Sequence, residues 1–300
     1  MRQDKTQIKT MNSTENNIQH TALLVKDLAQ LHEKNDRADV TFIVESRRIP
    51  AHRVILAARS EYFQALLYGA LMESMQDEIV LNVQLKPFQC LLQYIYSGSL
   101  SLDKMDQEEL IDLVMLADQY GFGELKSAIG CWLCKKIRLT NVCILLRCSS
   151  LFQLGTLYHA CLQYMDRHAA HVILHKSFLT LTFNLLNVLL DRKSFLISEV
   201  EKFHAIHKWC QQQKDSAQSF AKLYRKVSYT SMTYNQLFHI VRPSRVLQPD
   251  ELLNVIAVKE HAEVVHTRPI RSSIYKREML IPRNNGLKIV KLEYGKKNIS

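Results

Sequence analysis

Cysteine and histidine are the residues of this chain whose types and spacing could do chemistry. Cys131 and Cys134 form a Cys-Trp-Leu-Cys pair, the spacing of thiol redox motifs and of half a zinc site. A redox pair needs a helix N-terminus after a strand, where the dipole lowers a thiol pKa, but this pair falls late in a helical pattern. A zinc site needs about four ligands, and no second pair stands at matching spacing. We therefore expect both thiols to pack inside the fold.

The twelve histidines give no stronger site. His52 comes just ahead of an apolar helical pattern, and catalysis would need a nucleophile or carboxylate held beside it, so we expect it to be tied into the fold. His171 and His175 are four residues apart and could share a helix face, yet no acidic residue completes a metal site. The sequence contains no GxxxxGK[ST], GxSxG or GxGxxG motif. We expect no catalytic residue, no cofactor and no metal, and hence no enzyme.

Composition restricts the class and the compartment. The chain has 300 residues, 47% of them apolar, with only 8 Gly and 6 Pro, which favours about two helix-rich domains. No apolar run reaches the roughly 18 residues of a membrane span, and the polar N-terminus has no signal-peptide core. Seven cysteines are an odd number, which favours reduced, buried thiols over a disulfide framework. We expect a cytoplasmic protein without a membrane partner.

The net charge of +10 is unevenly distributed. Residues 1–34 carry +1, residues 35–134 carry −6, residues 135–259 carry +10 and residues 260–300 carry +5. A basic region can bind nucleic acid, but these charges are scattered over helical segments with no reading motif and little aromatic interleaving. We interpret them as a solvated basic face and expect no nucleic-acid partner.

Hydrophobic periodicity indicates an α+β module followed by an all-helical one. Alternating apolar residues at Val40, Phe42 and Val44 give way to a helical spacing by residue 59, which is typical of a hairpin that leads into a helix. Gly69 should end that helix, and Thr140 should be the N-cap of the next module's first helix. For the first module we expect strands at 39–45, 47–50 and 78–81 and helices at 20–31, 53–68, 86–98, 106–120 and 124–137. For the second we expect helices at 140–150, 154–168, 170–174, 177–179, 182–190, 199–214, 217–227, 233–239 and 250–258.

Several segments resemble the BTB/POZ domain family. Its D-V-x-F…A-H-x-x-x-L-A-A signature is matched at Asp39, Val40, Phe42, Ala51, His52, Leu56, Ala57 and Ala58. RSEYFQALLYG, LMES, KPFQCLLQYIYSG and LADQYGFGELK follow in the family's order and spacing. Residues 140–258, with YMDRHAA, SFLTL and IVRPSRVL, are similar to a BACK domain. Together the resemblance extends over residues 20–282.

This resemblance implies an α+β BTB/POZ domain, with helices clustered on a small sheet, followed by an all-α BACK domain. We expect a disordered N-terminus at 1–19, the BTB/POZ domain at 20–138, the BACK domain at 139–259 and a mostly irregular tail at 260–300. Similar family members continue into discoidin-like β-domains after the segment that matches residues 279–282. We expect this chain to lack them, which leaves its recruitment of a substrate open.

The resemblance also implies a partner, because many BTB domains bind cullin-3. The family's binding motif is an apolar residue, any residue and then Glu, which corresponds here to Leu71, Met72 and Glu73. An exposed apolar anchor beside a carboxylate suits a helical partner. The other interpretation is that the loop only closes the domain, with Leu71 in its core. We expect Tyr62, Tyr96 and the first BACK helices to support the contact.

A homodimer is implied as well. The helix that packs across the dimer axis in the family corresponds to the apolar stripe Leu23, Leu24, Leu28 and Leu31. Asp39 matches a buried Asp that, in the transcription-repressor branch, pairs with a basic residue in a charged dimer pocket. Pro50 stands at that basic position, which argues against co-repressor binding. We expect Asp39 to support either the hairpin or the dimer interface.

The function that we expect is that of a dimeric interaction scaffold, the adaptor between an unknown substrate protein and a cullin-3 RING ubiquitin ligase. The alternative is a BTB scaffold or regulatory protein that dimerises without recruiting a ligase.

Overall fold

The computed structural model describes residues 20–70, 72–213, 217–266, 277–283 and 286–292. Of residues 72, 73, 217 and 262–266 and of the last two segments it describes the backbone alone. The chain divides into two compact units, residues 1–223 and 224–300, which we describe one at a time. The expected disordered segment at 1–19 lies outside the described residues.

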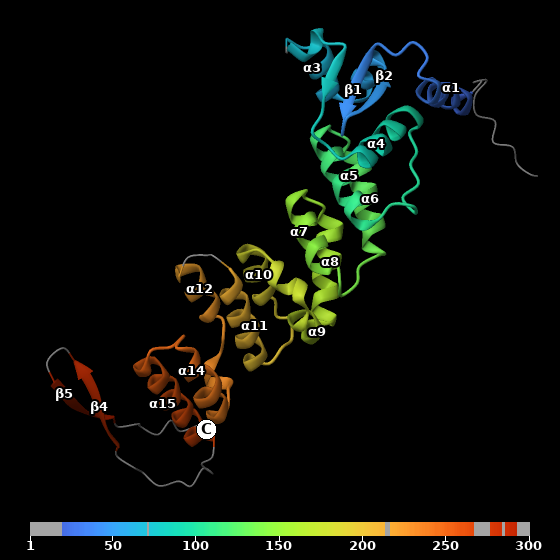
Figure 1. The fold of residues 1–300 in the computed structure, drawn as a ribbon. Coiled ribbons are helices and arrows are strands. Elements are labelled where there is room, and N and C mark those ends of the chain that lie inside the picture. Colours follow the sequence, from blue (N-terminus) through green and yellow to red (C-terminus); the bar gives the residue numbers. More distant parts are fainter. Residues whose placement is uncertain (1–19, 71, 214–216, 267–276, 284–285, 293–300) are drawn as a thin grey trace, which may run out of the picture. The chain divides into compact units, whose positions relative to one another are not determined.

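The first unit begins with an α+β module (Figure 1). Its elements are α1 (Thr21–Lys34), β1 (Val40–Val44), β2 (Arg47–Ala51), α2 (Arg53–Arg59), α3 (Glu61–Tyr68), the 3₁₀ turn η1 (Met72–Met75), β3 (Glu78–Val80), α4 (Leu85–Ser97), α5 (Gln107–Gln119) and α6 (Gly123–Cys134). Helices and 3₁₀ turns follow: α7 (Val142–Leu151), α8 (Gly155–Arg167), α9 (Ala169–Leu174), η2 (Lys176–Thr180), α10 (Phe183–Leu190), α11 (Glu199–Gln212) and α12 (Ala217–Tyr224). The predicted fold class, helices clustered on a small sheet followed by a helical region, is confirmed.

The sheet has the strand order β2-β1-β3, with β1 antiparallel to β2 and parallel to β3. Val40, Phe42 and Val44 of the central strand are buried and alternate with half-buried residues, as the sequence pattern predicts. Phe42 lies opposite Ile49 on one side and Ile79 on the other. The strand therefore presents one apolar face to the helices.

Four aromatic rings join this strand to three helices. Phe42 lies 6.0 Å from Phe63 of α3 and 5.5 Å from Phe88 of α4, measured between ring centroids. Phe63 lies 4.9 Å from Tyr120, the C-cap of α5. All four residues are fully buried. Tilted and edge-on rings at these separations are a favourable aromatic geometry, so this cluster fixes α3, α4 and α5 against the sheet.

The continuous helix predicted for residues 53–68 is wrong, because the chain breaks at Ser60. Ser60 is extended (φ −151°, ψ 125°) and is the N-cap of α3. Its Oγ accepts a hydrogen bond from the Phe63 N–H at 3.3 Å and donates one to the Tyr120 carbonyl at 2.6 Å. The apolar spacing continues through the break, which conceals it in the sequence.

Gly69 ends α3 as predicted, but for a different reason from the expected one. Its φ of −78° lies outside the left-handed region that glycine usually supplies at a helix end. A Cβ built on Gly69 would lie 2.2 Å from the Ala65 carbonyl oxygen, so glycine is needed here for close backbone approach. Gly98 and Gly121, with φ of 66° and 81°, are the left-handed glycines of the module.

The helical region is held by large buried side chains. Trp209 of α11 is fully buried, and its Nε1–H donates to the Leu181 carbonyl at 2.9 Å. Asn141, and not Thr140 as expected, is the N-cap of α7. The Asn141 side chain faces backwards and accepts from the Arg138 N–H at 2.7 Å, so it closes the preceding turn.

The second unit contains short helical turns, one long helix and a strand pair. Its elements are η3 (Tyr229–Ser231), α13 (Tyr234–Gln236), the π turn η4 (Leu237–Val241), α14 (Arg242–Ser244), α15 (Pro249–His266), β4 (Arg277–Arg283) and β5 (Gly286–Leu292). The strands pair antiparallel, with Met279 opposite Val290. Within the segment 260–300, expected to be a mostly irregular tail, the described residues thus contain the end of α15 and a strand pair. The alternation of Leu287 and Ile289 with Lys288 is a strand pattern that the charge of this region obscures.

Candidate partner-binding surface

Arg53 organises the segment that carries the predicted binding motif. Its Nη1 donates to the carbonyls of Leu67 at 3.0 Å and Ser74 at 2.9 Å, and its Nη2 donates to the carbonyl of Gln76. One guanidinium group thus joins the end of α3, the η1 turn and the approach to β3. The planar fork of arginine is suited to several fixed acceptors at once.

The motif residues themselves are described only in part. Leu71 lies outside the described residues, and the structure gives the backbone alone for Met72 and Glu73, which begin η1. Met75, the last residue of this turn, is 92% exposed. The backbone that carries Met72 and Glu73 is thus a short 3₁₀ turn that packs on α3.

Tyr62 of α3 lies at the surface, as expected for a contact residue. It is 36% exposed, and its ring rests on Tyr120 with a centroid separation of 4.8 Å. Tyr120 lies beneath it in the core, where burial raises its pKa to about 12. Tyr68, at the end of the same helix, is 57% exposed. Helix α3 therefore presents two exposed tyrosines to solvent, one of which packs on the buried Tyr120.

The expectation that Tyr96 is a partner contact is corrected. Tyr96 is only 2% exposed, and burial raises its pKa to about 12. Its hydroxyl accepts from the His52 backbone N–H at 2.9 Å and donates to His52 Nδ1 at 2.8 Å. His52 Nε2 lies 2.7 Å from the Asp36 carbonyl, which can only accept, so Nε2 carries the proton. His52 is tied into the fold as predicted, and Tyr96 is its partner there.

An apolar groove of about 520 Å³ lies between α5, α7 and α10. Its apolar lining comes from Ile111 and Met115 of α5, Ile144 and Leu151 of α7, and the buried Leu185 of α10. Met115 and Ile144 are each 39% exposed, and Leu151 is 73% exposed. Apolar surface gathered in a groove, unlike scattered single side chains, is typical of an interaction site.

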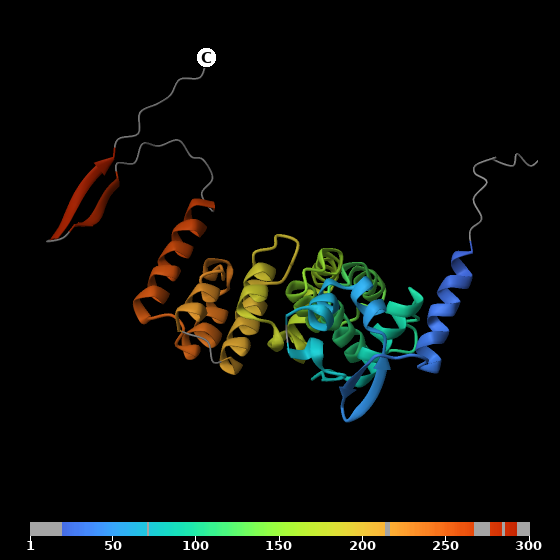
Figure 2. The ribbon, with the colours of Figure 1, turned by 90° about the horizontal axis from the view of Figure 1, so that it is seen from above.

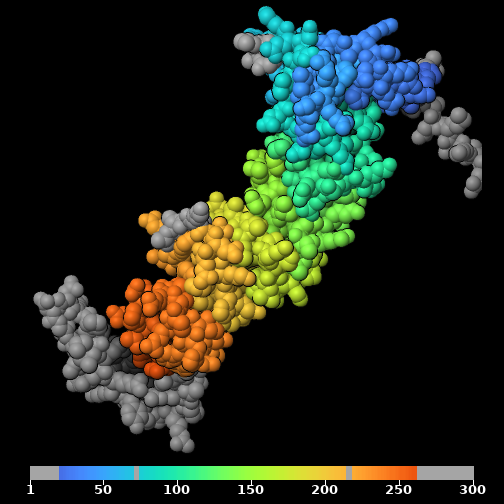
Figure 3. Space-filling model, viewed as in Figure 1, coloured from blue at the N-terminus to red at the C-terminus, as the bar shows by residue number. Residues whose placement is uncertain are grey.

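The helix α1 carries the stripe predicted for the dimer. Leu23 and Leu24 are 55% and 60% exposed, whereas Leu28 and Leu31 are half-buried where α1 packs on α4. Figures 2 and 3 place α1 at the margin of the first unit. No residue of α1 is fully buried. Its N-terminal half therefore presents apolar surface that the described residues do not cover.

Asp39 directly precedes β1, and its carboxylate reaches the first residue of α2. Its carboxylate accepts from the Arg53 N–H at 2.7 Å, and the Arg53 Nε–H donates to the Asp39 carbonyl at 3.2 Å. Asp39 itself is exposed. These two bonds join the start of β1 to the start of α2, and a role of Asp39 in the dimer stays a prediction.

Burial raises the pKa of several cysteine thiols, which disfavours their thiolate forms. The expectation that both thiols of the Cys-Trp-Leu-Cys pair pack inside the fold is wrong for Cys131, which is exposed. Cys134 is half-buried, burial raises its pKa, and its Sγ donates to the Gly130 carbonyl. Burial likewise raises the pKa of Cys148 to about 11 and of Cys161 to about 12. Over the described residues, no group of three or more His, Cys, Asp or Glu side chains is placed to hold a metal ion. His175 caps η2, accepting from the Ser177 N–H at Nδ1.

The sequence reasoning missed Arg53 and Ser60, which set the shape of this surface. A signal for Arg53 exists: a cation in the first turn of a helix opposes the helix dipole, so such a residue needs acceptors elsewhere. Ser60 gives a weaker signal, because a lone Ser between apolar helical residues is equally compatible with a helix interior.

No helix in the described part of the chain is long and apolar enough to cross a membrane.

Comparison with known proteins identifies both parts of the chain. The family model of the BTB/POZ domain matches residues 28–137, and that of the BACK region (BTB And C-terminal Kelch) matches residues 142–242. BTB/POZ domain-containing protein 9 of Drosophila melanogaster is 42% identical over 84% of this chain and 34% of its own length. The human protein of that name is 37% identical over 93% of this chain and 44% of its own length.

This chain therefore spans about a third to under half the length of these relatives. Among solved structures, the BTB domain of human gigaxonin is 24% identical and covers 41% of this chain and 96% of its own, with a TM-score of 0.32. Because the two family models match in tandem along one chain, this protein belongs to the BTB/POZ–BACK family of interaction scaffolds.

Proposed function

We propose that this protein is a dimeric adaptor that joins a substrate protein to a cullin-3 RING ubiquitin ligase. The observation that carries the proposal is the groove between α5, α7 and α10 and its link to α3. Tyr62 of α3 packs on Tyr120 at the end of α5, and Met115 of the groove lies on the same helix. A partner that contacts α3 can thus continue along α5 into the groove.

The chemistry of this surface suits a helical partner. Exposed aromatic and aliphatic side chains on α3 and η1 can act as central anchors. The groove can take an apolar helix face or an apolar extended segment. Arg53 supports the proposal, because its bonds to the carbonyls of Leu67, Ser74 and Gln76 fix the described backbone on both sides of the predicted motif.

The dimer is part of the same proposal. Leu23 and Leu24 stand more than half exposed in a single chain, and covering them with a second copy would remove apolar area from water. Two copies would present two ligase-binding surfaces. A cytoplasmic location accompanies this proposal, supported by seven free cysteines.

Calorimetry with the purified chain and the N-terminal domain of cullin-3 tests the ligase proposal. We expect one cullin-3 per protomer and a Kd of about 1 μM or tighter, as for a standard-size interface. A different cullin is the matched control and should give no heat. If cullin-3 also gives no heat at about 100 μM, the protein is a scaffold that does not recruit this ligase.

A further inference from the structure

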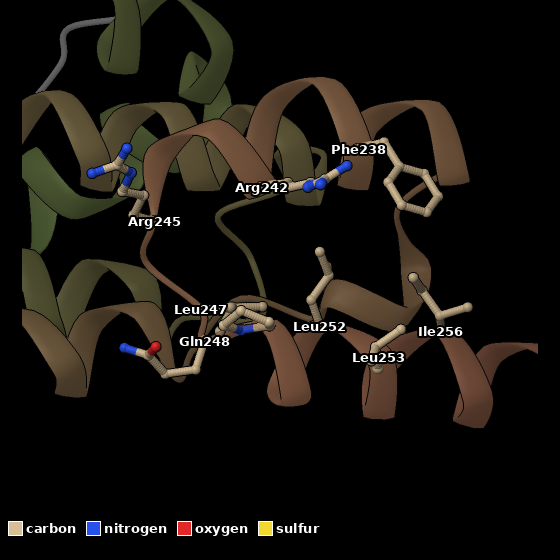
Figure 4. A pocket seen from close by; sticks show the side chains of 9 residues that line it. Phe238, Arg242, Arg245, Leu247, Gln248, Leu252, Leu253 and Ile256 are labelled. Carbon is tan, nitrogen blue, oxygen red and sulfur yellow. The ribbon is translucent and has the colours of Figure 1, made fainter.

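The second unit contains a groove that the adaptor proposal does not use. The chain passes through the π turn at Leu237–Val241, reverses at Arg245, whose φ of 56° is left-handed, and enters α15 at Pro249. A groove of about 650 Å³ lies between this turn and α15. Figure 4 shows Phe238 and Arg242 on one side of it and the leucines of α15 on the other. π turns are rare and are frequently found at functional sites.

The groove has an apolar floor that is open to solvent. Leu252 is buried at its base, whereas Leu253 and Phe238 on its sides are 62% and 42% exposed. Ile256 follows Leu252 and Leu253 by four and three residues, so the three share one face of α15. A small molecule is normally buried over most of its surface in its pocket. Side chains this exposed instead suit an elongated partner that lies along the groove.

The charge of the groove defines the partner more closely. Arg242 and Arg245 both line it and are both exposed. Within the described part of the chain, neither guanidinium group has a hydrogen-bond or ion-pair partner. The nearby Glu251 carboxylate is engaged at the start of α15, where it accepts from the Gln248 N–H at 2.8 Å. Two unpaired arginines beside apolar side chains are suited to carboxylates that flank an apolar surface.

We propose that this groove binds an amphipathic helical peptide segment of a partner protein, apolar on one face and flanked by Asp or Glu. Helix-in-groove binding uses anchors at helical spacing, which the apolar face of α15 can accept. The chain's own C-terminal segment is a poor occupant, because residues 267–300 carry nine Lys and Arg against two Asp and Glu. Like charges would then meet at Arg242 and Arg245.

The experiment uses the full chain and a fluorescein-labelled peptide of about 16 residues, four to five helical turns. The peptide carries Leu at helical spacing on one face and Glu beside it. A second peptide has Gln in place of every Glu. By fluorescence anisotropy, we expect the Glu peptide to bind at least about tenfold more tightly than the Gln peptide, and this advantage to shrink with added salt.

Variants separate the two parts of the groove. The double variant R242Q/R245Q should lose the advantage of the Glu peptide and leave the Gln peptide unchanged. Leu253→Gln should weaken both peptides. Arg225→Gln and Val258→Gln are the matched controls, because both side chains are exposed in the same unit and neither lines the groove. Circular dichroism would verify that each variant is folded.

Two results would overturn the proposal. One is a Glu peptide that does not saturate the protein by about 1 mM, the weak limit of specific recognition. The other is a Glu peptide that binds R242Q/R245Q as tightly as the parent chain. Neither result depends on cullin-3, so the groove and the ligase proposal can fail separately.

Discussion

Two hydrogen bonds join Asp39 and Arg53, one between the Asp39 side chain and the Arg53 backbone and one between the Arg53 side chain and the Asp39 backbone. The Asp39 carboxylate accepts from the Arg53 backbone N–H at 2.7 Å, and the Arg53 side chain returns a hydrogen bond to the Asp39 carbonyl at 3.2 Å. The first bond satisfies a free N–H at the start of α2. The second fixes the arginine so that its remaining donors reach α3 and η1. The hairpin, α2 and the motif segment are therefore one hydrogen-bonded unit.

Replacing Arg53 by Lys should loosen that unit. An ammonium keeps the charge but cannot span the carbonyls of Leu67, Ser74 and Gln76 in one geometry. We expect a loss of about 1–3 kcal/mol in unfolding free energy by urea denaturation. Amide exchange over residues 68–77 should also become faster.

Arg48→Lys is the matched control for that change. Arg48 pairs with Glu78 at the surface, with side chains 64% and 45% exposed, so its loss should cost no more than about 0.5 kcal/mol. Equal effects of the two substitutions would show that Arg53 has no special role in holding the motif segment.

The local pattern predicted the architecture well where each element has its own signal. The alternation of Val40, Phe42 and Val44 marks β1, and the Asp106–Glu109 capping box marks the start of α5. The break at Ser60 has no such signal, because its decisive bond goes to the Tyr120 carbonyl, sixty residues away. Contacts of that range are set by the tertiary fold, and no local periodicity reports them.

The sequence predicted where the candidate surface lies better than it predicted which of its residues are exposed. Tyr62 and Tyr96 both lie in motifs of the family, and nothing in the sequence separates a half-exposed tyrosine from a buried one. Their difference comes from packing: Tyr96 is enclosed between His52 and the stacked ring of His32, at 4.7 Å. The sequence likewise could not predict that Arg242 has no partner among the described residues, because that depends on which residues lie near it in three dimensions.

Ser60→Ala should reveal how much the hydrogen bonds of Ser60, at the break between α2 and α3, contribute to stability. Alanine removes both the cap on the Phe63 N–H and the bond to the Tyr120 carbonyl, at a site only 6% exposed. We expect a loss of about 1–3 kcal/mol in unfolding free energy. Ser97→Ala, at the half-buried C-terminal end of α4 where the side-chain hydrogen bonds are solvent-exposed, should stay within about 0.5 kcal/mol. A loss at Ser60 no larger than that at Ser97 would contradict the proposed role of the cap.

His32 should make the stability of the first unit depend on pH. Burial first, and the neighbouring His52 second, lower the pKa of His32 below 6.5, with Glu33 opposing them. Below pH 6.5, His32 therefore takes up a proton more readily in the unfolded chain than in the folded chain. As the pH falls through 6.5, unfolding becomes easier, and the penalty levels off below the folded pKa.

His32→Phe tests this dependence, because it keeps a ring against Tyr96 and cannot take a proton. Urea denaturation at pH 7.5, 6.5 and 5.5, values spaced by about one unit around the histidine range, should show a smaller acid loss in the variant. His171→Gln, at an exposed site on α9, should keep the parent's dependence. An unchanged acid loss in His32→Phe would assign the effect to other groups.

The dimer proposal predicts that charges on α1 produce a monomer. Leu23→Glu with Leu24→Glu places two carboxylates where the proposed interface buries apolar area. Light scattering should give twice 34.8 kDa for the parent chain at low micromolar concentration and 34.8 kDa for the variant. Leu174→Glu with Leu196→Glu, at sites 77% and 79% exposed, should leave the dimer intact. A parent chain of monomer mass would refute the dimer directly.

The cullin-3 proposal predicts a large effect of two substitutions in η1 and its approach. Leu71→Ala with Glu73→Ala removes an apolar anchor and a carboxylate, and central anchors typically contribute about 2 kcal/mol or more each. That is roughly thirtyfold in Kd per residue. Leu174→Ala with Glu260→Ala is the matched control, an exposed leucine and an exposed glutamate that belong neither to α3 or η1 nor to the lining of the groove.

A third variant distinguishes the motif from the groove. Ile144→Gln changes the groove between α5 and α7 and leaves η1 untouched. If the partner continues from α3 along α5, this variant should also weaken cullin-3 binding in calorimetry, by about tenfold. Weakening by Leu71→Ala with Glu73→Ala alone would confine the contact to α3 and η1. A motif variant that binds as tightly as the parent would instead mean that Leu71 only closes the domain.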